Sequence, residues 1–276
     1  MPADSEIDLR AATNALSDVI QNRPLPLRMF DQIYMKAGDM IVQSQIVARW
    51  ADRKRLAFIG DGDGISICVP LLKARGIVGE GPSEIMVYDF DERMCSAVER
   101  FADQERLANV HATLYNCFDA FPGPNHFDCF YTNPPWGASN GGESVCVFLE
   151  RGMEAVSFCG EGLVVIADDT ELHWPQQVLG RVQQFAHESG FFVQEMMPRM
   201  HLYHLDDAPN LRSCNLFIKA LPGPHTVSPS RAITDARRLV NFYGRGSTAQ
   251  VRYIREKKRL EYGMAHEDGY SLDLYK

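Results

Sequence analysis

The stretch 56-LAFIGDGDGIS-66 decides the fold of this chain. An apolar run ends at Gly60, and a helical pattern begins at Ile65, in 65-ISICVPLLKARG-76. Glycines at such a turn let the backbone bend sharply and approach a ligand without a Cβ clash, and the helix start offers unpaired N–H groups. Its position between a first strand and a first helix favours a ligand-binding turn. The simpler alternative is an ordinary turn in which an aspartate caps the helix.

Short apolar runs alternate with amphipathic stretches along the middle of the chain. The predicted strands are 56–60, 84–90, 110–116, 127–133, 162–168, 191–197 and 214–220, and the predicted helices are 65–76, 92–106, 144–158 and 175–190. Strands that alternate with helices indicate a parallel, doubly wound sheet. No clear helix separates the last two strands, so we expect one of them to be antiparallel. The predicted fold class is α/β, with a Rossmann-like, seven-stranded, mostly parallel sheet.

Two flanking segments surround this sheet domain, which we assign to residues 55–221. Residues 1–54 are expected to be helical, because apolar residues recur at helical spacing in 40-MIVQSQIVARW-50. Residues 222–276 begin with a turn-rich linker. They continue with two basic stretches that we predict to be helices, 231–244 and 248–263. The fold would then have helical N- and C-terminal extensions.

Length and composition exclude several classes of protein. The chain has 276 residues, of which 45% are hydrophobic and 23% charged, so it is neither a disordered chain nor a coiled-coil rod. No apolar run reaches the ~18 residues of a membrane span, and the acidic N-terminus lacks the pattern of a secretory signal. We therefore expect a cytoplasmic protein with no membrane partner. Its seven scattered cysteines are expected to be reduced and structural.

The formal net charge of −8 constrains the ligand. Proteins that bind duplex nucleic acid usually have a basic face, so a nucleic-acid partner is possible but less expected. A cationic substrate is compatible with the negative net charge. The basic C-terminal stretches leave three alternatives open. They could form a solvated face, contact an acidic surface of a second subunit in a homo-oligomer, or bind RNA or DNA.

Acidic residues follow the first three predicted strands. Asp61 and Asp63 make the glycine turn strongly negative, which suits a sulfonium or an amine better than a dinucleotide pyrophosphate. Asp89 ends the second strand, where an acidic residue can accept hydrogen bonds from both hydroxyls of a ribose. Asp119 follows the third strand. Its carboxylate could accept a hydrogen bond from an adenine amino group, or it could lie in a solvated loop.

The motif 131-YTNPPWG-137 ends the fourth predicted strand, where open α/β sheets bind ligands. Asn133 supplies a carboxamide oxygen, and Pro134 cannot donate, so nearby carbonyls are left to accept. Trp136 offers a flat aromatic face, which suits a planar group or a cation. The motif therefore predicts an acceptor-rich pocket for an N–H group.

These motifs, in this order and on these strands, resemble those of the class I S-adenosylmethionine-dependent transferases. The sequence NPPW is similar to the N/D-PP-Y/F/W motif of methyltransferases that act on planar amino nitrogens. The resemblance implies that S-adenosylmethionine or its decarboxylated form is the co-substrate. It assigns donor contacts to Gly60, Gly62, Gly64, Asp89 and Asp119, and contacts with the target nitrogen to Asn133, Pro134, Pro135 and Trp136.

A narrower resemblance covers most of residues 30–220. The segment 31-DQIYMKAGDMIVQSQIVARW-50, the acidic glycine turn, 127-FDCFYTNPPWG-137 and 149-LERGMEAV-156 look like the branched-chain polyamine synthases, the N4-bis(aminopropyl)spermidine synthases. That family transfers aminopropyl groups from decarboxylated S-adenosylmethionine to a polyamine, and its glycine turn reads GDDD. The resemblance implies that the acidic turn meets the amine end of the donor. Asp61 and Asp63 would repel the carboxylate of the intact donor.

The expected reaction is a displacement at a carbon next to a sulfonium, for which an enzyme mainly aligns the reactants. The attacking amine has a pKa near that of lysine, about 10, and must lose a proton. We expect Asp61 or Asp63 to take that proton or to relay it to water. An acidic rim of Asp168, Asp169 and Glu171 could hold the distal charges of a polyamine, or it could be a solvated loop.

Two other functions remain open at this point. One is methyl transfer to an amino group of a nucleobase or a small molecule, and the other is a non-catalytic, ligand-binding subunit. No metal site is expected, although His201, His204, Asp206 and Asp207 are close in sequence. Residues three apart in an extended stretch point to opposite faces, so a loop or a flap is expected there.

Overall fold

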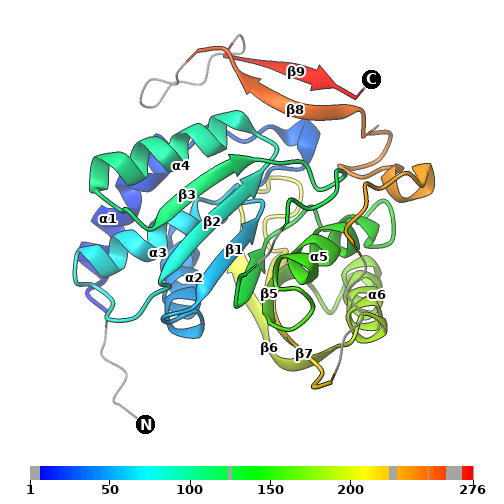
Figure 1. The fold of residues 1–276 in the computed structure, drawn as a ribbon, viewed down its shortest axis with the longest axis horizontal. Coiled ribbons are helices and arrows are strands. Elements are labelled where there is room, and N and C mark those ends of the chain that lie inside the picture. Colours follow the sequence, from blue (N-terminus) through cyan, green and yellow to red (C-terminus); the bar gives the residue numbers. More distant parts are fainter. Residues whose placement is uncertain (1–6, 124–125, 224–228, 248, 259–268, 276) are drawn as a thin grey trace.

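A seven-stranded sheet forms the centre of the molecule. The computed structural model describes residues 7–123, 126–223, 229–247, 249–258 and 269–275. The strands lie in the order β3-β2-β1-β4-β5-β7-β6 (Figure 1). Their bounds are β1 Arg55–Ile59, β2 Glu84–Asp89, β3 Val110–Leu114, β4 Cys129–Thr132, β5 Glu161–Asp168, β6 Phe191–Leu202 and β7 Arg212–Ala220. Each coincides with a predicted strand, so the predicted fold class is confirmed.

One strand of the sheet runs against its neighbours. β1 pairs in parallel with β2 and β4, as do β2 with β3 and β4 with β5. β7 is antiparallel to both β5 and β6, so β7 is the expected antiparallel strand. The chain winds outward from β1 to β3 and then returns to β4 on the other side of β1. Ligands bind at the carboxyl ends of the strands where the winding reverses in this way.

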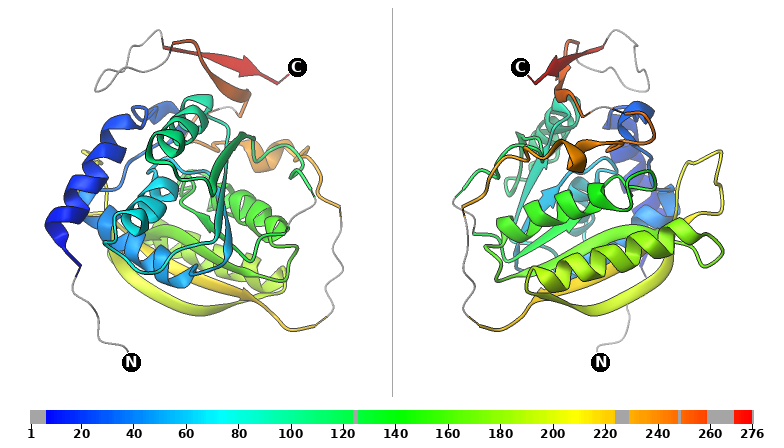
Figure 2. Two further views of the ribbon diagram at one scale, coloured as in Figure 1. Left: turned by 60° about the vertical axis from the view of Figure 1, so that its left-hand side comes forward. Right: turned by 90° about the vertical axis from the view of Figure 1, so that its right-hand side faces the viewer.

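Helices cover both faces of the sheet (Figure 2). Side chains alternate between the faces along a strand. In β1, Leu56 and Phe58 pack with one group of helices, and Ala57 and Ile59 pack with the other. The first group is α1 Leu9–Asn22, α2 Ala37–Trp50, α3 Ile65–Ala74 and α4 Glu92–Glu105, and the second is α5 Glu143–Ala155 and α6 His173–Glu188. The helices predicted between the strands are therefore present.

The N-terminal segment is helical, as predicted, and it reaches the end of β6. A short 3-10 helix, η1 Arg28–Phe30, follows α1. Lys36 N then donates to the carbonyl of Leu202, and His204 N donates to the carbonyl of Tyr34, both over 2.9 Å. Two segments that are far apart in the sequence are thereby joined beside the carboxyl edge of the sheet.

The prediction of a helical C-terminal extension is wrong. Residues 231–244 contain a four-residue 3-10 helix, η2 Ala236–Leu239, and are otherwise irregular, with turns at 241–243. The second stretch forms strand β8 Val251–Glu256, which pairs with β9 Tyr270–Leu274, while residues 259–263 lie outside the described residues. Valine, tyrosine and isoleucine favour strands, and Ile254 N donates to the carbonyl of Phe90 over 3.0 Å. Tertiary contacts therefore outweighed the local helical pattern.

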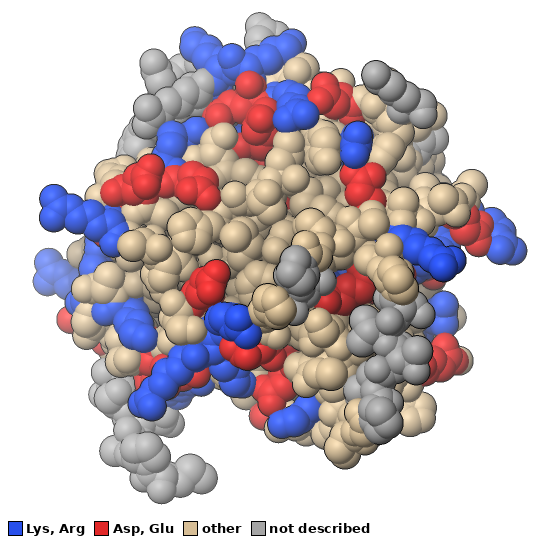
Figure 3. All heavy atoms as spheres, viewed as in Figure 1, with Lys and Arg blue, Asp and Glu red and all other residues tan. Residues whose placement is uncertain are grey.

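Several arginines of the C-terminal segment pair with acids of the same chain. Arg238 contacts Glu143 and Glu150, and Arg252 contacts Asp119. Among the described residues in Figure 3, Lys and Arg side chains lie beside Asp and Glu rather than in one continuous basic patch. This mixed surface is typical of a solvated face. None of the helices in the described ranges has the length and apolar character needed to cross a membrane.

Candidate active site

A cavity of about 370 Å³ opens at the carboxyl ends of β1, β2, β3 and β4. This volume is in the range of pockets that bind small molecules. Residues that follow these strands line it: Gly60, Asp61, Gly62, Asp63, Asp89, Phe90, Asn116, Cys117, Asn133, Pro134, Pro135 and Trp136. Further walls come from residues 28–34 and from residues on 203–211. Most of the site residues predicted from the sequence therefore meet in one place.

The glycine turn bends in the way its composition predicts. Gly60 and Gly64 have φ angles of 72° and 78°, which favour glycine. Gly60 N donates to the carbonyl of Tyr88 over 2.8 Å, so the turn starts in register with β2. Gly60 and Gly62 line the cavity, whereas Gly64 is the N-cap residue of α3.

Asp61 occupies the start of α3. Its carboxylate accepts hydrogen bonds from Ile65 N at 3.0 Å and from Ser66 N at 3.1 Å. The residue is only 3% exposed, and burial raises the pKa of its carboxyl well above the usual range, against the lowering effect of the hydrogen bond from Ser66. N–H groups at a helix start attract anions. Here a carboxylate of the protein itself satisfies them, so Asp61 both caps the helix and lines the cavity.

Asp63 joins three parts of the site. Its Oδ1 accepts from Met35 N at 2.6 Å, and its Oδ2 accepts from the side-chain amide of Asn133 at 2.7 Å. The guanidinium of Arg23 donates to the carbonyl of Asp63 over 2.6 Å. Burial raises the pKa of the Asp63 carboxyl, and the charge of Arg23 opposes that rise. The carboxylate is thus fixed between the N-terminal segment and the turn after β4.

Asp89 ends β2 and lines the cavity. Its oxygens accept from Asp61 N at 3.0 Å and from Asp91 N at 2.9 Å. Burial and the neighbouring charge of Asp91 raise the pKa of Asp89 to about 6. Each carboxylate oxygen has a second lone pair, so Asp89 retains the capacity to accept from a ligand hydroxyl.

The NPPW turn forms the wall after β4. All four of its residues line the cavity, and the ring of Trp136 meets Tyr203 edge-on, with centroids 4.9 Å apart. The nitrogen of the Asn133 amide is used by Asp63. Its oxygen is therefore the atom that could accept an N–H from a ligand.

A chain of buried polar groups lies behind this wall. The Tyr203 hydroxyl is 3.0 Å from Ser213 Oγ, and Ser213 Oγ is 2.9 Å from His201 Nδ1. Burial lowers the pKa of His201 to about 4, so the imidazole is neutral at pH 7. The part of the chain that the structure describes contains no group of three or more His, Cys, Asp or Glu that could hold a metal.

Aromatic residues from both terminal segments complete the cavity, and sequence reasoning missed them. Phe30 and Tyr34 come from the N-terminal segment, and Tyr243 comes from the C-terminal segment. Phe148 on α5 and Trp174 on α6 also line it. These residues lie in no recognisable motif. Only the run of aromatics in 242-FY-243 could have pointed to a buried anchor in the last segment.

Five predicted site residues do not line the cavity, namely Gly64, Asp119, Asp168, Asp169 and Glu171. Asp119 accepts from the guanidinium of Arg252 at 3.1 Å and from the hydroxyl of Tyr275 at 3.3 Å. Asp168 accepts from Arg199 N at 2.7 Å, and Asp169 accepts from Glu171 N at 2.8 Å. The carboxylates of Asp119, Asp168 and Asp169 therefore stabilise local structure.

Comparison with known proteins identifies relatives. Residues 11–273 match the family model of the branched-chain polyamine synthase A C-terminal domain. The chain is 26% identical, over 140 residues, to the N(4)-bis(aminopropyl)spermidine synthase of Thermococcus kodakarensis. That alignment covers 49% of this chain and 37% of the relative. The chain spans less than half of the length of the curated relatives it matches.

Solved structures share the fold. One is the branched-chain polyamine synthase from Thermus thermophilus in complex with N4-aminopropylspermidine and 5′-methylthioadenosine. It has a TM-score of 0.66 and 20% identity, and the match covers 81% of this chain and 67% of that chain. A putative RNA methyltransferase from Pyrococcus horikoshii has a TM-score of 0.58 and 14% identity, over 77% of this chain and 100% of that one. The fold is thus methyltransferase-like.

Proposed function

This chain belongs to the branched-chain polyamine synthase family, and from that premise we propose that it transfers an aminopropyl group from decarboxylated S-adenosylmethionine to an amine nitrogen of a polyamine. The Thermus relative was crystallised with an aminopropylated polyamine and 5′-methylthioadenosine. That nucleoside is what remains of the donor after the transfer. The pair of ligands supports an aminopropyl donor and a polyamine acceptor for this chain as well.

One observation carries the choice of donor: the carboxylate of Asp61 already accepts hydrogen bonds from the N–H groups at the start of α3. The intact donor has a carboxylate, for which a helix start is a natural partner. In this cavity it would meet Asp61 and Asp63 instead, and like charges repel. The decarboxylated donor presents only a protonated amine, which favours the charged form of both carboxyls and is attracted to them.

The nucleoside part of the donor would lie over β1 and β2. Asp89 follows β2 in the position from which an acidic residue holds the ribose hydroxyls in this class of fold. Both of its oxygens accept backbone N–H groups, which fixes the carboxylate in one orientation. Gly60 and Gly62 bring the backbone close to the ligand without a Cβ.

The acceptor would bind beside Asn133 and Asp63. Its nitrogen attacks the carbon next to the sulfonium, so that the N–C bond forms as the C–S bond breaks and sulfur keeps the electron pair. An ammonium has no lone pair, so the nitrogen must lose a proton to a base before the N–C bond forms. Asp63 lines the cavity next to Asn133, and burial raises the pKa of Asp63, which favours a proton on its carboxylate. We therefore assign the proton transfer to Asp63.

The test has two parts. The first is calorimetric titration of the purified chain with S-adenosylmethionine and with its decarboxylated form. We expect the decarboxylated donor to bind at least tenfold more tightly. The second is mass spectrometry of spermidine incubated with the chain and that donor, which should detect an added aminopropyl group together with 5′-methylthioadenosine.

Other outcomes point to other functions. A preference for the intact donor, with an added methyl group on an amine, would replace aminopropyl transfer by N-methyl transfer, for which NPPW is also suited. Binding of a donor without any product would identify a ligand-binding subunit. Assembly into a homo-oligomer is a further part of the proposal, to be measured by light scattering at the protein concentration of the assay.

A further inference from the structure

Tyr243 is the one residue of the described C-terminal ranges that lines the cavity. Its ring is stacked on Phe90, with centroids 5.8 Å apart and an angle of 13°, and meets Phe30 edge-on at 5.3 Å. Phe90 directly follows Asp89, the acid assigned to the ribose. Three segments that are far apart in the sequence thus meet in an aromatic group beside the nucleoside end of the cavity.

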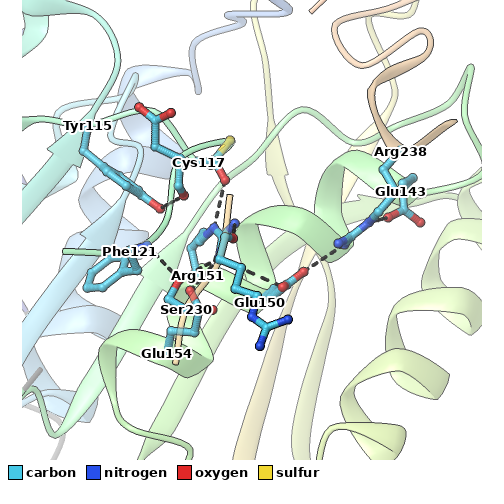
Figure 4. A network of polar contacts seen from close by, with 11 residues as sticks. Tyr115, Cys117, Phe121, Glu143, Glu150, Arg151, Glu154, Ser230 and Arg238 are labelled. Atoms are coloured by element: carbon cyan, nitrogen blue, oxygen red, sulfur yellow. Dashed lines mark hydrogen bonds and ion pairs between the residues drawn. The ribbon is translucent and has the colours of Figure 1, made fainter. Parts of the chain in front are cut away.

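Buried contacts hold the segment that carries Tyr243. Phe242 is fully buried, its ring meets Phe118 at 4.6 Å, and its carbonyl accepts from Ser144 Oγ over 2.6 Å. The guanidinium of Arg238 pairs with Glu143 and Glu150 on α5 (Figure 4). The position of Tyr243 is therefore set by anchors on both the core and α5.

Arg151 links the same segment to the loop after β3. Its side chain is fully buried, and Nε donates to the carbonyl of Cys117 over 2.8 Å. Its Nη2 donates to the carbonyl of Arg231 over 2.9 Å, and its Nη1 donates to Ser230 Oγ over 3.0 Å. Figure 4 shows this guanidinium between the two segments. Cys117 and Tyr243 are thus held as two walls of one cavity.

The polar residues that follow β3 present no free charge to this end of the cavity. Asp119 accepts from Arg252 and Tyr275 and does not line the cavity. The Asn116 side chain accepts from Phe118 N and donates to the carbonyl of Arg252. Burial raises the pKa of the Cys117 thiol, so that side chain is uncharged. A flat, neutral group that stacks on aromatic rings fits this surface better than a charged one.

We propose that Tyr243 binds the purine of the donor by ring contact, so that the C-terminal segment forms part of the nucleoside site. The identity of the ligand rests on the proposed function. The aromatic wall, and its dependence on a segment outside the sheet domain, rest on the contacts above. Recognition of the base would then depend on stacking, and not on a hydrogen bond from its amino group to Asp119.

The test is calorimetric titration with 5′-methylthioadenosine, an uncharged nucleoside. Base–aromatic stacking is worth roughly 1–3 kcal/mol per base, so Tyr243→Ala should weaken binding by about fivefold to 150-fold. Tyr243→Phe should bind as the unmodified chain does, because the ring is retained. Val240→Ala changes an exposed residue of the same segment and is the matched control. Spermidine affinity should be unchanged in all three.

Each outcome decides one question. If the unmodified chain binds no nucleoside, the proposed function fails. If it binds the nucleoside and Tyr243→Ala binds equally well, the role of Tyr243 is overturned while the proposed function stands. Equal losses for the nucleoside and spermidine would also overturn it, because they indicate a general disturbance. Should the alanine variant not fold, Tyr243→Leu keeps the apolar volume without the aromatic ring and is expected to show the same loss.

Discussion

The side-chain amide of Asn133 donates to the carboxylate of Asp63 over 2.7 Å. This contact joins the turn after β1 to the turn after β4, the two strands between which the winding of the sheet reverses. The carboxylate also decides the orientation of the amide, because only the nitrogen can donate to it. The residue that we propose to contact the acceptor and the residue that we propose to take its proton are thus fixed to each other.

Asp63→Asn should abolish most of the transfer. The substitution removes the carboxylate proposed to receive the proton, and it places the new amide next to the amide of Asn133. General acid–base catalysis contributes about 100-fold to 10,000-fold, so we expect kcat to fall by at least about 100-fold. The rate of product formation at saturating donor and acceptor measures this.

The control for that variant is Asp128→Asn. Asp128 lies next to β4 but at its opposite end, where it accepts from Arg55 N over 2.8 Å. Its substitution should leave kcat within about twofold. Equal losses in the two variants would mean that the effect of Asp63→Asn comes from altered structure, and Asp63 would lose its assigned role.

Asp61→Asn should weaken the choice between the two donors. The amide oxygen can still accept one N–H of α3, but the negative charge that repels a donor carboxylate is gone. We expect the ratio of the two dissociation constants to move toward unity by about tenfold, which corresponds to ~1.4 kcal/mol. Asp8→Asn changes a capping aspartate of α1 that accepts from Ala11 N. It should leave the ratio unchanged, and a shift there would count against the role of Asp61.

The sequence was sufficient to predict the sheet and most of the acidic residues that line the cavity. Parallel strands have their carboxyl ends at one edge of the sheet, so Asp61, Asp89 and Asn133 had to converge once the strands were correctly identified. The capping of α3 by Asp61 was the simpler alternative for the glycine turn. It is present together with the cavity contact rather than instead of it.

Long-range contacts explain what the sequence did not predict. Asp119 follows β3 as expected, but its partner Arg252 comes from β8, and nothing local to either residue indicates this pair. Tyr243 reaches the cavity because buried Arg151, half-buried Arg238 and buried Phe242 attach its segment to the core. Helical periodicity places the arginines of that segment on one helical face, and it contains no information about acids on other elements with which they could pair.

The affinity for 5′-methylthioadenosine should rise as the pH increases from 5 to 7, with a midpoint near 6. Burial raises the pKa of Asp89 to about 6. Above that pH the carboxylate accepts from the ribose hydroxyls, and below it the neutral acid accepts more weakly. Asp89→Asn should bind weakly and show no such pH dependence in calorimetric titrations.

A second carboxyl of the cavity titrates in the same range and must be separated from Asp89. Burial raises the pKa of Asp31 to about 6, which the charge of Arg28 opposes. Asp31→Asn should retain the pH profile, because Asp31 comes from the N-terminal segment and not from β2. A profile that disappears in Asp31→Asn but persists in Asp89→Asn would contradict the assignment of the ribose to Asp89.

Two helical glycines should respond to alanine with opposite signs. A Cβ on Gly152 of α5 would overlap the ring of Phe130 in β4, and overpacking of this kind costs roughly 1–3 kcal/mol. Gly180 of α6 has no atom within 4 Å of the same position, so Gly180→Ala should stabilise by up to about 1 kcal/mol. Urea unfolding measures both. Gly152→Ala should also impair nucleoside binding, because α5 carries Phe148 to the cavity.

Arg28 and Asp207 should tune the affinity for the polyamine. Both line the cavity, and their charged groups are 3.9 Å apart with largely exposed side chains. A cationic acceptor is repelled by Arg28 and attracted by Asp207, so Arg28→Ala should lower KM for spermidine and Asp207→Asn should raise it. Exposed charges contribute little, so we expect KM to change by about twofold to fivefold at low salt, with kcat unchanged.

Asp206→Asn is the control for Asp207→Asn. It removes the same charge from the neighbouring residue, which does not line the cavity, and should leave KM unchanged. The differences should vanish near 1 M salt, where the Debye length is about 3 Å. Equal effects of Asp206→Asn and Asp207→Asn would mean that the overall charge of the loop, and not contact with the acceptor, determines KM.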